Sequence, residues 1–175
     1  MNLHNNKDFE IAGKLRRLIN LGGSFKDLYF FYPDFFGYSQ TGALAKAKRV
    51  YHDLRPDRPI AKPNRAVNFQ VLVRPVKNIR PVTNFALIVY SAICDVKHDM
   101  DLKEVFVDIY EAWLTHHEES TESPVLNFQK AFAVYEYVVT ATQSKYNYSL
   151  IIDCEKCSSK YIFIDAHEGT CPYCR

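Results

Sequence analysis

Two pairs of cysteines near the C-terminus constrain this chain most. Cys154 and Cys157 are separated by two residues, as are Cys171 and Cys174, and thirteen residues lie between the two pairs. Two such turns direct four thiolates at one point, with a spacing close to that of four-cysteine zinc sites. Four thiolates close a tetrahedral coordination sphere and leave no position for water or substrate. The sequence therefore predicts one structural Zn²⁺ per chain.

Redox dithiols and disulfides are the alternatives for the same cysteines. The first ten residues lack the apolar run of a signal peptide, and the longest charge-free stretch, Pro81 to Cys94, is shorter than the ~20 residues of a membrane helix. We therefore expect a cytoplasmic chain that is not membrane-bound, and in a reducing compartment paired cysteines favour metal over disulfides. Cys94 is left over within the apolar stretch.

The length and composition predict a folded, mainly α-helical protein. The chain has 175 residues, of which 47% are hydrophobic, enough for one core and a small appendage. Apolar residues recur at helical spacing in several segments, and a bundle of helices should form the core. A zinc-ribbon-like segment is too short to bury a core of its own, so the metal would hold it together. The predicted helices span 9–21, 24–33, 39–54, 82–97, 101–117 and 124–142, with strand-like residues at 161–164.

These patterns divide the chain into four predicted segments. A helix-turn-helix-like region comes first, followed by a basic bridge rich in Pro and Arg, a helical core and the zinc-binding segment. Their bounds are 1–54, 55–81, 82–145 and 146–175.

Charge is distributed unevenly along the chain. Residues 1–80 carry a net charge of +9 and residues 81–175 one of −7. Lys and Arg gathered on one surface attract phosphates, so the first half is expected to face a polyanion. A solvated surface with no such partner is the alternative.

The helix predicted to end near Leu54 is amphipathic, and its outer face is cationic. Leu44, Ala47, Tyr51 and Leu54 form the apolar stripe. A helix, a short turn and a basic amphipathic helix is the layout with which helix-turn-helix proteins enter the major groove of DNA. The residues predicted to contact DNA from this helix are Lys46, Lys48, Arg49 and His52.

The bridge at 55–81 holds five prolines, seven Lys or Arg residues and one acid, so a long helix is not expected there. A short strand at 69–73 is an option. Such an extended basic segment can follow a phosphate backbone, or it can be only a linker. The residues predicted to contact DNA from the bridge are Arg58, Lys62, Arg65, Arg74, Lys77 and Arg80.

Aromatic residues fill seven of the ten positions from Tyr29 to Tyr38. They either join the first helices together or face a partner protein, in which case Phe35 and Phe36 are the predicted partner-binding residues. Catalytic patterns are scarce, because the run from His116 to Glu119 lacks the spacing of H-E-x-x-H and no glycine-rich phosphate loop or nucleophile elbow is present. We therefore expect that the protein is not an enzyme.

In their order, these segments resemble the FlhC family, the larger subunit of the bacterial FlhD–FlhC transcription activator. The resemblance covers nearly the whole chain and lies in LRRLINLGGSFKDL, ALAKAKRVYHDLR, FVDIYEAWL, AFAVYEYVV and LIIDCEKCSSKYIFIDAHEGTCPYC. It implies a cytoplasmic DNA-binding activator that assembles with an FlhD-type small helical subunit into a hetero-oligomer and recruits RNA polymerase. Flagellar genes, or the transfer genes of conjugative elements, would be its targets. The only site residues that the resemblance carries over are the four paired cysteines, as ligands of one structural zinc.

Two classes of function are thus open. One is a DNA-binding activator subunit, and the other is a zinc-ribbon adaptor that binds protein or RNA without reading DNA. Salt-dependent affinity for duplex DNA distinguishes the two classes, because phosphate contacts release counterions.

Overall fold

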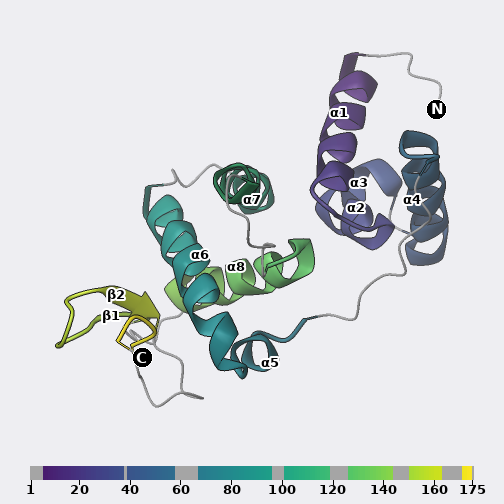
Figure 1. Ribbon diagram of the computed structural model, residues 1–175. Coiled ribbons are helices and arrows are strands. Elements are labelled where there is room, and N and C mark those ends of the chain that lie inside the picture. Colours follow the sequence, from purple (N-terminus) through teal and green to yellow (C-terminus); the bar gives the residue numbers. More distant parts are fainter. Residues whose placement is uncertain are drawn as a thin grey trace. The chain divides into compact units, whose positions relative to one another are not determined.

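A computed structural model describes residues 6–37, 39–57, 67–95, 101–118, 126–143, 150–162 and 171–174. Within these ranges the protein is mainly helical, with eight helices and one two-stranded sheet (Figure 1). The chain forms two compact units, Met1–Arg65 and Ala66–Arg175, here called unit 1 and unit 2. The prediction of a mainly α-helical protein is confirmed. No helix in the described ranges is both long and apolar enough to cross a membrane.

Unit 1 contains α1 (Asn6–Asn20), α2 (Phe25–Phe31), α3 (Pro33–Phe36) and α4 (Gln40–Leu54). Helix α1 ends at a glycine pair, where Gly22 has a φ of 94° and the Gly23 N–H donates to the Leu18 carbonyl at 2.9 Å. A Cβ on Gly23 would lie 2.8 Å from that carbonyl oxygen. Only glycine therefore fits this turn, which sends the chain into α2.

Helix α2 begins with the predicted capping box. The Ser24 N–H and Oγ both donate to the Asp27 carboxylate, at 2.6 and 2.7 Å. The helix predicted at 24–33 is confirmed as α2 but ends at Phe31, because the chain turns at Tyr32, and a further short helix, α3, starts at Pro33. Proline suits that first helical position, since its fixed φ is helical and its missing N–H has no partner there.

Helix α4 has nearly the predicted bounds. Its buried face consists of Ala43, Ala47, Val50 and Tyr51, at helical spacing. The predicted stripe residues Leu44 and Leu54 are only half-buried.

Unit 2 contains α5 (Phe69–Val73), α6 (Val76–Asp95), α7 (Leu102–Glu118) and α8 (Phe128–Gln143). The strand considered at 69–73 is wrong, because this segment is the short helix α5. Phe69, Leu72 and Val73 are buried together, which is the spacing of one helical face, and the Asn68 side chain caps the first turn by accepting from the Gln70 N–H at 2.8 Å.

Helix α6 begins at Val76, six residues earlier than predicted, and includes Pro81. Proline removes one backbone hydrogen bond here, but its fixed φ is compatible with a helix, so the expectation of an extended chain fails at 76–81. The buried Asn78 side chain donates to the Leu72 carbonyl at 2.8 Å and ties α6 to the end of α5.

Aromatic rings fill the core between α6, α7 and α8. The fully buried Phe106 ring lies 5.2 Å from Phe128 and 4.9 Å from Phe132, and Phe85 lies 5.4 Å from Trp113, measured between ring centroids. These rings, with Tyr135, are core packing, as their helical spacing predicts.

Helix α8 starts at Phe128, four residues later than predicted from Pro124, which lies outside the described ranges. The Asn127 side chain accepts from the Lys130 N–H at 3.1 Å and caps this end of the helix.

One buried hydroxyl in α6 gives a stability prediction. Thr83 is 0% exposed, and its Oγ1 has no hydrogen-bond partner within the described part of the chain. Thr83→Val keeps the shape and removes the unsatisfied group, so we expect unfolding to cost about 1 kcal/mol more and the Tm to rise by about 4 °C. Thermal unfolding followed by circular dichroism measures this change.

Thr142→Val is the matched control, since that exposed hydroxyl donates to the Val138 carbonyl at 3.0 Å. It should change the free energy of unfolding by less than about 0.5 kcal/mol. A lower Tm for Thr83→Val would contradict the absence of a partner for the Thr83 hydroxyl.

Candidate metal centre

The four paired cysteines meet at one point in unit 2. The Sγ atoms of Cys154, Cys157, Cys171 and Cys174 all lie within 4.8 Å of one another. The Cys154 and Cys174 sulfurs are 3.6 Å apart, and the Cys157 and Cys171 sulfurs are 3.8 Å apart. We call this cluster the four-cysteine centre.

The sulfur separations fit one tetrahedral ion. A Zn–S bond of about 2.3 Å places the sulfurs of a regular tetrahedron about 3.8 Å apart. A disulfide would need about 2.05 Å, and all four cysteines are free thiols. The four-cysteine centre can therefore hold one metal ion with every ligand supplied by the chain.

A two-stranded sheet delivers the first cysteine pair. Strands β1 (Ile151–Asp153) and β2 (Lys160–Ile162) are antiparallel, with Asp153 opposite Lys160. Between them the Ser158 N–H donates to the Cys154 carbonyl at 2.8 Å, and Ser158 has a φ of 59°. This left-handed residue closes the turn so that both thiols point to the same side.

The turn also stabilises thiolates. The Ser159 side chain and N–H donate to Cys157 and lower its pKa to about 6. The N–H groups of Cys157 and Lys156 likewise lower the pKa of Cys154. By contrast, the neighbouring sulfurs of Cys157 and Cys154 raise the pKa of Cys174 to about 12. Four thiolates this close repel one another, so a divalent cation is what allows all four to ionise together.

A small apolar cluster supports the four-cysteine centre. Cys154, Tyr161 and Cys171 are buried, and Ile152 and Tyr173 pack against them. This is too little apolar surface to hold the segment without further bonds. Residues 163–170, which contain the rest of the strand expected at 161–164, lie outside the described ranges.

The segment that carries the four-cysteine centre packs against α6 (Figure 1). The Tyr173 hydroxyl donates to the Asn84 side-chain oxygen, and the Arg80 guanidinium carbon lies 5.5 Å from the centroid of the Tyr173 ring. Sequence reasoning did not find these partners, because contacts between positions 80–84 and 173 are set by tertiary packing. The one available signal is an aromatic residue inside the second cysteine pair.

The predicted DNA-contacting residues of α4 differ in availability. Lys48, Arg49 and His52 are exposed, and none of them makes an ion pair in the described part of unit 1. Lys46 is already engaged, because its Nζ donates to the Phe35 carbonyl at 2.6 Å and lies 4.5 Å from the centroid of the Phe35 ring.

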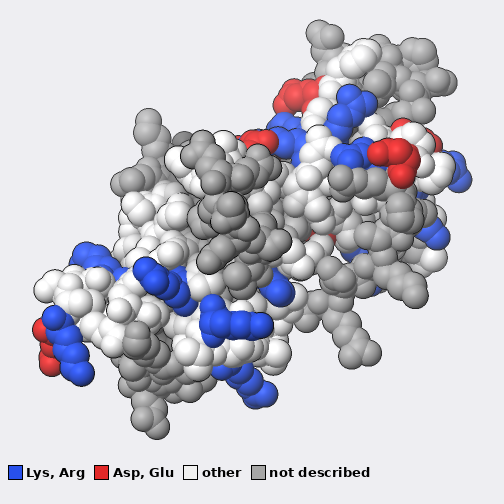
Figure 2. All heavy atoms as spheres, in the orientation of Figure 1, with Lys and Arg blue, Asp and Glu red and all other residues white. Residues whose placement is uncertain are grey.

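The predicted contacts of the bridge fall into two groups. Arg58, Lys62 and Arg65 lie outside the described ranges. Arg74, Lys77 and Arg80 are exposed between the end of α5 and the first turns of α6. In Figure 2, Lys and Arg side chains are spread over the part of unit 2 that carries α6 and the strands, and acidic side chains are sparse there.

The two predicted partner-binding residues, Phe35 and Phe36, are less exposed than a partner-binding role leads us to expect. Phe36 is only 5% exposed and packs edge-on against Phe35, so its ring belongs to the core of unit 1. Phe35 is half-buried beneath Lys46. Among the described residues of the aromatic run, Phe30 has the exposed ring, at 46%.

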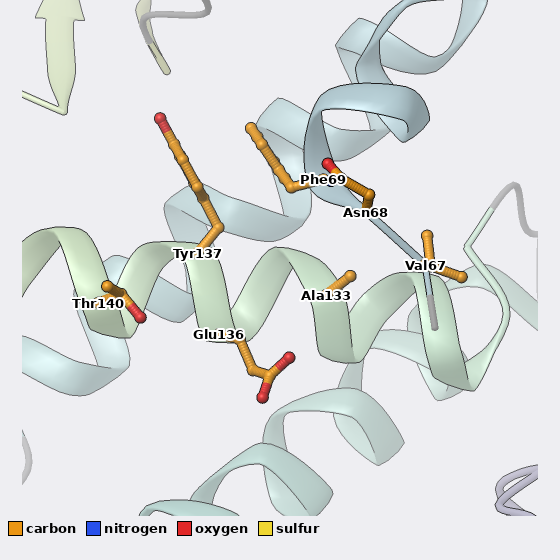
Figure 3. A pocket seen from close by; sticks show the side chains of 7 residues that line it. All are labelled: Val67, Asn68, Phe69, Ala133, Glu136, Tyr137 and Thr140. Atoms are coloured by element: carbon orange, nitrogen blue, oxygen red, sulfur yellow. The ribbon is translucent and has the colours of Figure 1, made fainter. Parts of the chain in front are cut away.

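A surface hollow of about 440 Å³ lies between the start of α5 and α8 (Figure 3). Phe69 and Tyr137 stack there at 3.8 Å between centroids, whereas the Glu136 carboxylate points away from both rings. Burial raises the pKa of Glu136. The polar groups of this hollow do not converge on one point, so it offers no catalytic arrangement.

Comparisons with protein-family models, with curated proteins and with solved structures found no match for this chain.

Proposed function

We propose that this chain is an FlhC-type subunit of a DNA-binding transcription activator. In this proposal the four-cysteine centre holds one structural Zn²⁺, and the chain acts in the cytoplasm without an enzymatic activity of its own. It assembles with an FlhD-type small helical subunit and recruits RNA polymerase to flagellar or conjugative-transfer promoters. The alternative is a zinc-ribbon adaptor that binds protein or RNA without reading DNA.

The outer face of α4 carries the proposal. Lys48, Arg49 and His52 are exposed on the side opposite the buried Ala43, Ala47, Val50 and Tyr51. The short helices α2 and α3 precede α4 and pack against it. This order of elements is compatible with a helix-turn-helix whose second helix enters the major groove. Cations without acidic partners on such a face suit phosphates and base edges.

The geometry of the four-cysteine centre supports a structural role for the metal. All four ligand positions of a tetrahedral ion are filled by thiols, so a water or substrate has no place on it. Zinc suits this soft donor set better than a hard cation does.

The proposed assembly has a separate basis. Phe30 presents an exposed ring on α2, and an exposed aromatic residue is a typical anchor for a partner protein. Co-expression with a small helical FlhD-type subunit, followed by co-purification and DNase footprinting, tests the assembly and the DNA binding in one preparation. A chain that stays a stable monomer and does not bind the FlhD-type subunit would contradict the proposed assembly.

We expect Arg49 to read a base and Arg65 to contact a phosphate. Arg49 lies in the middle of the exposed face of α4, where a bidentate contact to guanine is within the reach of an arginine. Arg49→Ala should relax the sequence preference at one position by ~1–3 kcal/mol and leave non-specific affinity nearly unchanged. Arg65→Ala should weaken binding to all sequences alike and lower the salt slope by about one.

Electrophoretic mobility shifts across a salt series, on specific and random duplexes, separate these two effects. Arg16→Ala is the matched control, because it removes an exposed cation from α1. Wild-type behaviour of both Arg49→Ala and Arg65→Ala would favour the adaptor function instead.

A further inference from the structure

One residue of the metal-binding segment, Tyr173, contacts the cationic part of α6. It lies inside the second cysteine pair, and its hydroxyl donates to the Asn84 side chain on α6. The Arg80 guanidinium lies over its ring, with 5.5 Å between the guanidinium carbon and the ring centroid. Tyr173 therefore contacts α6 by a hydrogen bond and by a cation–π interaction at neighbouring turns of the helix.

Arg80 belongs to an exposed stripe along α6. Lys77, Arg80, Asn84, Ile88 and Ser91 are all exposed and recur every three or four residues, which places them on one face. Lys77 and Arg80 are separated by about 4.5 Å along the helix axis, and Arg80 and Asn84 by about 6 Å. The stripe contains two cations and no acid.

The ring of Tyr173 restrains Arg80 without neutralising it. A guanidinium that lies against an aromatic face keeps its N–H groups available at the edge of its plane, where a phosphate binds. An arginine that is ordered before binding loses less side-chain entropy on contact with the phosphate. Arg80 makes no ion pair in the described part of the chain and is exposed, so its charge is available to an anion.

The position of Tyr173 depends in turn on the four-cysteine centre. Its neighbours Cys171 and Cys174 are both ligand candidates, and the apolar cluster beneath the turn is small. When the cysteines do not share an ion, little else holds residues 171–174 against α6. The metal and the Arg80 side chain are thus linked through one aromatic ring.

We propose that the four-cysteine centre has a positioning function: through Tyr173, the bound metal orients Arg80 for contact with a DNA phosphate. This inference rests on the proposed DNA-binding function and deepens it. The positioning residue is Tyr173, and the surface that it completes is the Lys77–Arg80 part of the α6 stripe. Because such coupling is reciprocal, a DNA that makes this contact also raises the affinity of the chain for the metal.

The test compares five forms of the full chain, in complex with its partner subunit if it requires one. They are wild type, Tyr173→Phe, Tyr173→Leu, Arg80→Ala and the double variant of Tyr173→Leu with Arg80→Ala. Fluorescence anisotropy with a labelled duplex is recorded across a salt series. Tyr173→Leu leaves the Arg80 charge in place but no longer orders its side chain, so it should weaken binding about fivefold with little change in the salt slope. Arg80→Ala removes the charge itself, so it should lower the salt slope by about 0.9, which is about fivefold weaker binding at ~0.15 M salt. The double variant should be no worse than Arg80→Ala. Tyr173→Phe keeps the ring and should bind within about twofold of wild type.

A second readout does not involve DNA. In the zinc-loaded full chain, the ¹⁵N–¹H signal of the Arg80 Nε should be shifted by the Tyr173 ring. Both removal of zinc with a chelator and Tyr173→Leu should return this signal to the position of a free arginine.

These readouts separate the two hypotheses. If wild type binds no DNA but the Arg80 signal responds to zinc, the proposed function fails and the linkage between metal and Arg80 stands. If DNA binds and the Tyr173→Leu variant, with its zinc content intact, keeps the wild-type affinity, the positioning function is overturned. An Arg80 signal that is unchanged by zinc removal overturns it equally.

Discussion

Cys171→Ser is expected to abolish zinc binding and to unfold the segment that contains the four-cysteine centre. Cys171 is buried in the apolar cluster of the segment, and its sulfur lies 3.8 Å from that of Cys157. A serine hydroxyl is a poor ligand for zinc, and three remaining thiolates leave the coordination sphere open. Because metal binding supplies the folding free energy of so small a segment, losing the ion should lose its structure.

Zinc content by elemental analysis and near-ultraviolet circular dichroism measure this effect. Cys94→Ser is the matched control, since Cys94 is an exposed thiol of α6 that does not belong to the four-cysteine centre. It should keep one equivalent of zinc per chain. Less than about half an equivalent in wild type purified without chelator, or normal folding of Cys171→Ser, would contradict the metal site.

The second large effect is the salt dependence of DNA binding. If about six of the predicted cations meet phosphates, the logarithm of the binding constant should fall against log salt with a slope near −5. Raising salt from ~50 to ~200 mM should then weaken binding about a thousandfold. The candidates that are exposed in the described ranges are Lys46, Lys48, Arg49, His52, Arg74, Lys77 and Arg80, and of these Lys46 already donates to the Phe35 carbonyl.

This slope also separates the two classes of function. A protein that recognises another protein through apolar and hydrogen-bonded contacts has no condensed counterions to release, so its affinity changes far less over this range. Fluorescence anisotropy on a random duplex gives the slope directly. A flat response would favour the zinc-ribbon adaptor.

The helices were predictable where one periodic pattern decides the local structure. The capping box at Ser24 and Asp27, the glycine stop after α1 and the aromatic spacing of α7 and α8 are all local signals. The meeting of the four cysteines followed from their spacing, because each C-x2-C turn fixes the direction of its own thiols.

The predictions that were wrong or missing concern features that local sequence patterns do not determine. Proline and charge predicted an extended bridge, but burial of Phe69, Leu72 and Val73 made a helix of 69–73, and the fixed φ of Pro81 suited α6. The burial of Phe36 and the contact of Tyr173 with Asn84 depend on elements that are distant in sequence or on neighbouring turns, and no periodicity encodes them.

The most direct test of the proposed function is selection from a random duplex pool with the zinc-loaded chain and its co-purified partner subunit. A DNA-binding activator subunit discriminates its site from non-specific DNA by a factor of typically about 10³ or more, so several rounds should enrich one sequence motif. We predict such a motif, and we expect Arg49→Ala to lose the base preference at one of its positions. A pool that stays random, at a salt concentration where the complex is intact, would contradict it.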